Sequence, residues 1–170
     1  VNNVNNSLPG WYTVTYNVSD TAGNNAVEVV RTVLVQDTII PVITLNGNTS
    51  ILHEAGTTYT DEGATASDNL DGDLTNSIIV VNNVNDSVPG SYTVTYNVSD
   101  AAGNSAVEVV RTVVVNAKPV ANDQDVTVTQ AIGKVIGLSG SDSDSTQTLL
   151  YSVVTAPSSG NLSGSSQSLT

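Results

Sequence analysis

The chain has 170 residues and carries 16 acidic side chains against four basic ones, so its net charge is −12. Nucleic acids and anionic membranes bind clustered lysine and arginine, and this charge therefore argues against both as partners. The sequence contains no cysteine, which excludes disulfide bonds, thiolate catalysis and cysteine-based zinc sites. No apolar run approaches the roughly 18 residues of a membrane-spanning helix, so we expect no membrane insertion of this segment.

A tandem repeat organises the chain. Residues 1–35 and 81–115 are identical at 29 of 35 positions. This spacing predicts that 1–36 is the C-terminal part of one repeat, that 37–116 is a complete domain, and that 117–170 is the N-terminal part of a different domain. Pieces this short bury too little apolar surface to fold unaided. We therefore expect the chain to be a window from a longer repetitive protein.

The residue pattern predicts strands and no helices. Valine occupies 28 positions and threonine 21, and both favour strands because they branch at Cβ. In chain order, strands are predicted over residues 41–46, 57–60, 78–81, 92–98 and 106–115, with a turn at 99–104. Apolar and polar side chains alternate most clearly in 92–98. These short strands predict an all-β Greek-key sandwich.

A tyrosine near the start of the penultimate strand adds a sharper signal. Tyr92 stands two positions before the predicted core residue Val94, and residues 9–14 repeat the feature. This is the arrangement of the tyrosine corner in immunoglobulin-like sandwiches.

Residues 41–115 also resemble a known family. The stretches PVITLNG, TYTDEGATASDNLDGDLT and VPGSYTVTYNVSDAAGNSAVEVVRTVVV are similar to the bacterial Ig-like repeats of surface proteins, which are related to the Ig-like domain of pesticidal crystal proteins and to hyalin-type repeats. The third part, with PVANDQDVTVTQ, GSDSDSTQTLLYSVV and SGNLSG, resembles cadherin-like bacterial repeats. The two resemblances imply tandem Ig-like Greek-key β-sandwiches arranged as beads on a string.

Clustered acidic residues suggest a calcium site. The sequence DNLDGD at 68–73 offers three carboxylates and an amide around a glycine, and calcium prefers such oxygen ligands. The distal glutamate and the flanking helices of an EF-hand are missing, so an EF-hand is excluded. The alternative is a solvated turn in which these side chains bond their own backbone.

An Ig-like sandwich would place this loop, the 100–104 turn and the preceding linker at the same end. Crowded carboxylates repel one another and favour a bound cation. A second joint would follow the same logic, and the cadherin-like resemblance adds the Asp-x-Asp at 142–144. The full set of predicted ligands is Asp37, Asp68, Asn69, Asp71, Asp73, Asp100 and Asn104 at one joint, Asp123, Asp142 and Asp144 at the next, and Asp20 and Asn24 at a joint upstream. Extracellular modules of this kind bind calcium at about 10⁻⁴–10⁻³ M.

No catalytic pattern stands out. His53 is the only histidine, and no nucleophile elbow accompanies it. Asp61 and Glu62 are adjacent, and in a strand they would point to opposite faces rather than act together. Trp11 is replaced by Ser91 in the second copy, which favours an incidental exposed aromatic over a sugar-binding anchor. We therefore expect a protein that is not an enzyme.

These observations predict the stalk or spacer region of a large bacterial cell-surface or secreted adhesin, located outside the cell. Its partners would be neighbouring domains of the same chain, and calcium would stiffen the joints. Two alternatives stay open. The chain could build an extracellular homopolymeric filament, in which other copies are partners, or it could supply spacer or glycan-binding accessory modules of a secreted hydrolase.

Overall fold

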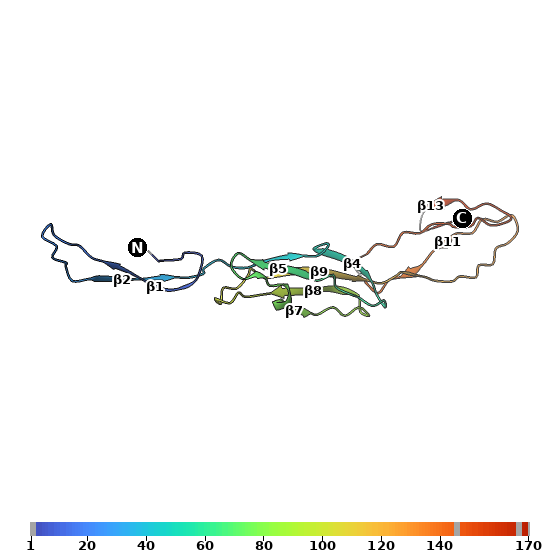
Figure 1. The fold of residues 1–170 in the computed structure, drawn as a ribbon. Coiled ribbons are helices and arrows are strands. Elements are labelled where there is room, and N and C mark those ends of the chain that lie inside the picture. The colour runs from blue at the N-terminus through green and yellow to red at the C-terminus, as the bar shows by residue number, and fades with distance from the viewer. Residues whose placement is uncertain (1–2, 145–146, 166–167, 170) are drawn as a thin grey trace. The chain divides into compact units, whose positions relative to one another are not determined.

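The structure is a computed structural model that describes residues 3–144, 147–165 and 168–169 (Figure 1). Every regular element is a β-strand except η1 (Thr75–Ser77), a single turn of 3-10 helix. Within these described ranges there is no α-helix, and therefore none of a length and hydropathy that would span a membrane. The prediction of an all-β fold is confirmed.

The first two strands form an antiparallel hairpin. Strand β1 (Gly10–Tyr16) pairs with β2 (Val29–Val35), and Gly10 lies opposite Val35 while Tyr16 lies opposite Val29. The segment that connects the two strands contains an isolated antiparallel β-bridge between Ser19 and Asn25.

The middle of the chain forms two sheets. One has the strand order β3-β5-β6 and the other the order β4-β9-β8-β7. Strand β4 runs parallel to β9, with Ser50 opposite Thr112, while β3 and β5 are antiparallel. The strands are β3 (Val42–Leu45), β4 (Ser50–Glu54), β5 (Ala64–Asp68), β6 (Gly72–Asp73), β7 (Ile79–Asn82), β8 (Gly90–Asn97) and β9 (Val109–Asn116). This is the architecture of an Ig-like β-sandwich.

Some predicted strands differ from the structure. The prediction of a strand over 57–60 is wrong, because the backbone N–H and hydroxyl of Thr57 both donate to the carbonyl of Glu54, at 3.3 and 2.7 Å, and close a turn after β4. Strand β9 begins at Val109 rather than at 106. Ahead of it, the Ala106 N–H donates a hydrogen bond to the Val98 carbonyl. Strands β4 and β5 were not predicted.

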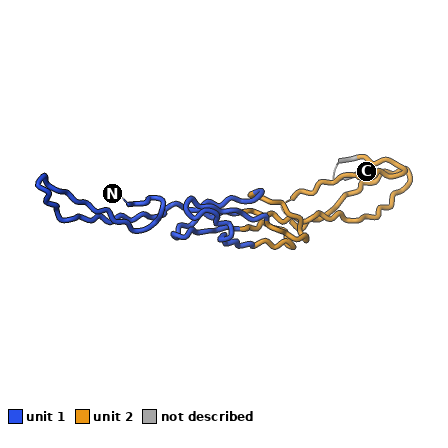
Figure 2. Tube along the Cα trace, viewed as in Figure 1, with its two compact units in different colours: residues 1–48, 62–82, 95–110 blue, residues 49–61, 83–94, 111–170 orange. Residues whose placement is uncertain are grey.

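The chain divides into two compact units (Figure 2). Unit 1 comprises residues 1–48, 62–82 and 95–110, and its buried side chains are Pro41, Ile43, Ala66, Tyr96, Val98, Asp68 and Asp100. Unit 2 comprises residues 49–61, 83–94 and 111–170, and its buried side chains are Val94, Arg111, Val113 and Val115.

A buried ion pair lies in unit 2. The Arg111 guanidinium is 2.6 Å from Asp61 Oδ2, and the Arg111 side chain is only 1% exposed. The Tyr59 hydroxyl donates to the same carboxylate at 2.7 Å. Asp61 and Glu62 lie outside the strands, so the prediction that they sit on opposite faces of a strand is wrong, and Asp61 instead balances a buried cation.

Both copies of the predicted tyrosine corner are present. The Tyr92 hydroxyl donates to the Val88 carbonyl at 2.9 Å, and the Tyr12 hydroxyl donates to the Leu8 carbonyl at 2.8 Å. Each bond fixes the loop that leads into its strand.

The last part of the chain has only two-residue strands. Strand β10 (Val120–Ala121) pairs with β12 (Gly140–Ser141), and β14 (Ser168–Leu169) pairs with both β11 (Ile136–Gly137) and β13 (Gly164–Ser165). The predicted boundaries at 36/37 and 116/117, and the cadherin-like character of this part, remain predictions.

Candidate metal centre

Three carboxylates from distant parts of the sequence meet in unit 1. Asp37 lies in the linker between β2 and β3, Asp71 in the loop between β5 and β6, and Asp100 in the turn after β8. One oxygen atom from each lies within 4.8 Å of the other two. In the described part of the chain this is the one group of three side chains placed to hold a metal ion.

Asn104 connects the 100–104 turn to the linker. Its backbone N–H and its Nδ2 donate to the two carboxylate oxygens of Asp100, each at 2.7 Å. The same Nδ2 lies 3.3 Å from the backbone carbonyl of Asp37. Asp100 is 7% exposed, and these bonds fix the orientation of its carboxylate towards the linker.

The 68–73 loop is held by its own aspartates. Asp68 Oδ1 accepts the backbone N–H groups of Leu70 at 2.8 Å and Asp71 at 3.1 Å, and these two bonds hold the pKa of Asp68 below its usual value. The folded loop then directs Asp71 Oδ2 to the backbone N–H of Ala101, at 2.7 Å. Asp71 is thereby placed beside the turn that carries Asp100.

The other predicted ligands of this joint have different surroundings. Asp73 Oδ1 accepts the backbone N–H of Thr75 at 2.9 Å, and Thr75 hydrogen bonds hold the pKa of Asp73 below its usual value. Asn69 lines a pocket of about 410 Å³, together with residues of the linker and of the loop before β1, including Ser7, Gln36 and Thr38. Neither residue belongs to the three-carboxylate group.

The geometry of the group suits calcium. Calcium–oxygen distances are about 2.3–2.6 Å, so two ligand atoms on one ion lie at most about 5 Å apart. Two oxygens, Asp37 Oδ2 and Asp68 Oδ2, are inaccessible to solvent and have no hydrogen-bond donor. Two carboxylates about 4.8 Å apart repel each other by roughly 3 kcal/mol near a protein surface. A divalent cation bound to the three carboxylates would remove this repulsion.

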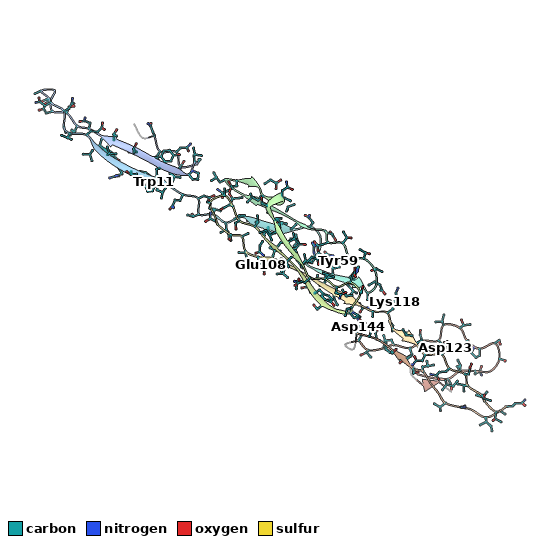
Figure 3. The ribbon with its side chains drawn as sticks, turned by 90° about the horizontal axis from the view of Figure 1, so that it is seen from below. Trp11, Tyr59, Glu108, Lys118, Asp123 and Asp144 are labelled. Atoms are coloured by element: carbon teal, nitrogen blue, oxygen red, sulfur yellow. The ribbon has the colours of Figure 1, made fainter. Side chains whose placement is uncertain are left out.

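A second acidic pair, Asp142 and Asp144, lies in unit 2, and Figure 3 labels Asp144 of this pair. Asp144 Oδ2 accepts the Ala117 N–H at 3.0 Å, and the Asp144 N–H donates to Asp142 Oδ1 at 3.1 Å. Burial, followed by the nearby Asp142 carboxylate, raises the pKa of Asp144. Asp123 joins no group of three ligating side chains among the described residues, so a three-carboxylate centre is not formed there.

In the first repeat, the turn at 20–24 has the same hydrogen bonds as the turn at 100–104. Asp20 accepts from the Asn24 backbone N–H at 2.8 Å and from its Nδ2 at 2.7 Å, as Asp100 does from Asn104, and the pKa of Asp20 is lowered mainly by the Asn24 side chain. Asp20 belongs to no three-carboxylate group among the residues that the structure describes, and its role at an upstream joint stays a prediction.

The two sheets, the tyrosine corner and the parallel β4–β9 pair agree with a sequence comparison. Residues 43–115 match the family described as "Bacterial surface protein, Ig-like domain". This part of the chain has the fold of an Ig-like domain. The three carboxylates thus come from the linker ahead of the Ig-like domain, which carries Asp37, and from two of the domain's own loops, which carry Asp71 and Asp100. No curated protein is similar in sequence to the chain.

Several solved structures are similar to parts of the chain. A lipoprotein of Bacteroides thetaiotaomicron (BT2262) is 26% identical with a TM-score of 0.41, and the match covers 45% of this chain and 38% of the lipoprotein. A Clostridium perfringens ZmpB structure, with CBM51-2 bound to GlcNAc and with INT domains, is 25% identical with a TM-score of 0.38, and the match covers 57% of this chain and 21% of that one. The chain thus spans less than half the length of either structure.

Proposed function

We propose that this chain is a non-catalytic stalk or spacer region of a bacterial cell-surface or secreted adhesin, and that calcium stiffens the joint ahead of its Ig-like domain. The match of residues 43–115 to an Ig-like domain of bacterial surface proteins supports a structural role outside the cytoplasm. The near-identity of residues 1–35 and 81–115 supports a tandem arrangement in which neighbouring domains are the partners.

One observation carries the calcium proposal. Asp37 belongs to the linker, whereas Asp71 and Asp100 belong to two loops of the Ig-like domain, and all three carboxylates converge within 4.8 Å. A cation bound to them ties the linker to the domain. Without the cation, the carboxylates repel one another and the linker moves more freely. Binding at about 10⁻⁴–10⁻³ M would fill the site in extracellular fluid and leave it empty in the cytosol.

The test is a calcium titration of the whole chain. Calcium at tenfold excess over its dissociation constant stabilises the folded state by about 1.4 kcal/mol. For a domain of this size, the melting temperature should then rise by about 5–10 °C. Small-angle scattering should show a longer particle with calcium than with chelator.

Two variants make the test specific. Asp71→Asn removes one carboxylate of the group and should abolish the calcium response. Asp125→Asn makes the same chemical change at an exposed residue outside the group, and it should respond as the parent does. If Asp71→Asn keeps the full response, the site proposed here is wrong and calcium acts through the overall negative charge. If the parent does not respond, the array is independent of calcium.

A further inference from the structure

Strands β4 and β9 lie side by side and run in the same direction (Figure 1). Ser50 lies opposite Thr112, and Glu54 lies opposite Asn116. All of these residues belong to unit 2. The chain enters β4 at Ser50 and leaves β9 at Asn116, and in a parallel pair these two points lie at opposite ends of the ladder. Tension along the chain therefore pulls the two strands past each other along their length.

This geometry strains all hydrogen bonds of the ladder at the same time. At one end of β4, the Thr112 N–H donates to the Thr49 carbonyl at 2.9 Å. At the other end, the Ala55 N–H donates to the Asn116 carbonyl at 2.8 Å, so the ladder extends beyond the strand in both directions. In an antiparallel pair, the entry to one strand and the exit from the other lie at the same end, and tension breaks the bonds one after another.

The side chains of β9 oppose the same sliding motion. The buried Arg111 guanidinium pairs with Asp61 at 2.6 Å, and Val113 and Val115 are 0% and 1% exposed. Sliding β9 by one residue would turn these side chains to the opposite face of the sheet, because side chains alternate along a strand. It would also separate the ion pair where water cannot stabilise the two charges. Only the observed register keeps this face of β9 buried and its charge paired.

We propose that the parallel β4–β9 pair, locked by the Arg111–Asp61 ion pair, is the element that resists tension in the Ig-like domain. This inference deepens the proposed stalk function and rests on it for its biological meaning, because a stalk transmits force along its own chain. The mechanical resistance does not depend on calcium, since Asp37, Asp71 and Asp100 lie outside both strands.

The experiment pulls on the whole chain in two directions. The chain contains no cysteine, so two introduced cysteines determine where the handles of an optical trap attach. Thr38→Cys with Pro119→Cys places the handles ahead of β3 and after β9, and tension then shears the β4–β9 pair. Thr58→Cys with Pro119→Cys is the control. It pulls both strands from the Glu54–Asn116 end and opens the same pair bond by bond.

The two directions should differ in unfolding force. With chelator present and at equal loading rates, we expect the shear direction to need about twice the force of the control direction, because about six bonds rather than one break in each step. The length released on unfolding scales with the number of residues between the handles and identifies the event. Equal forces overturn the proposal. They leave the calcium titration that tests the stalk joint unaffected, so the two proposals can fail separately.

A proline variant distinguishes the β4–β9 ladder from β3, which the shear direction also strains. Ala55→Pro removes the N–H that bonds the Asn116 carbonyl. Proline suits this position, because the Thr57 N–H donates to the Glu54 carbonyl at 3.3 Å and makes Ala55 the second residue of a turn. Gly56 follows with a φ of +80°, as in a type II turn, where proline is common at the second position.

The variant should change force without changing stability. The reduced freedom of the unfolded chain offsets the lost hydrogen bond, so the urea midpoint should stay near that of the parent. The shear force should fall by roughly a sixth, because one of about six ladder bonds is lost. A shear force that Ala55→Pro leaves unchanged would show that another element resists the tension and would overturn the assignment to β4–β9.

Discussion

Arg31 and Arg111 occupy equivalent positions in the repeat and have opposite surroundings. The Arg111 side chain is 1% exposed and paired with Asp61, whereas Arg31 is exposed. Leaving a buried charge without its partner is costly, because water cannot reach the remaining ion. The sequence itself contains a signal for this pair. In VVRTVVV, arginine stands at an inward position of the strand alternation, where a charge requires a partner.

Removing the two arginines should therefore have unequal effects. Arg111→Ala leaves the Asp61 carboxylate unpaired, and we expect it to lower the free energy of unfolding by about 3–5 kcal/mol. Arg31→Ala makes the same change at the matched exposed position and should shift stability by no more than about 0.5 kcal/mol. Urea unfolding of both variants measures the difference. Equal losses would show that the Arg111–Asp61 pair does not stabilise the domain.

Tyr59 should make stability depend on pH at the alkaline end. Burial, and then the hydrogen bond and charge of Asp61, raise the pKa of Tyr59 to about 12. The folded state therefore favours the neutral phenol. Its contribution is complete below the unfolded pKa of about 10 and is lost as the pH rises towards 12. Urea midpoints between about pH 9 and 11.5 should fall less steeply in Tyr59→Phe than in the parent, and identical slopes would contradict this assignment.

At the scale of elements, alternation identified some strands and missed others. Strand β8 was predicted because large and polar side chains alternate along it. Strand β5, ATASD, has small and polar side chains that resemble a loop, and it forms by pairing with β3. Strand β4 depends in the same way on β9, which lies far along the sequence, beyond four other strands. Short strands whose stability comes from distant partners are not visible in local patterns.

The sequence likewise predicts only part of the arrangement of the acidic side chains. Topology places the linker and two loops at one end of an Ig-like sandwich, and Asp37, Asp71 and Asp100 do converge there. The sequence does not reveal which aspartates of the 68–73 loop face the linker. That choice depends on the backbone hydrogen bonds made by Asp68 and Asp73, which hold the loop and orient Asp71.

At the scale of the whole molecule, two hairpins of nearly identical sequence, β1–β2 and β8–β9, are packed differently. A two-stranded hairpin without a covering layer is marginally stable, whereas β8 and β9 lie in a four-stranded sheet with a buried face. Because 29 of 35 residues are identical, the two hairpins have almost equal intrinsic rates of amide exchange. Any difference between their observed rates must therefore come from tertiary packing.

Amide hydrogen exchange of the unmodified chain should reveal this difference. We expect amides of β1 and β2 to exchange at least about a hundredfold faster than those of β8 and β9, which corresponds to about 2.7 kcal/mol. Peptides from the two copies differ in mass at Trp11 against Ser91 and at Leu34 against Val114, so mass spectrometry separates them. Similar protection in both copies would mean that the hairpin is stable without a cover, and that local strand pairing rather than packing sets the stability of this repeat.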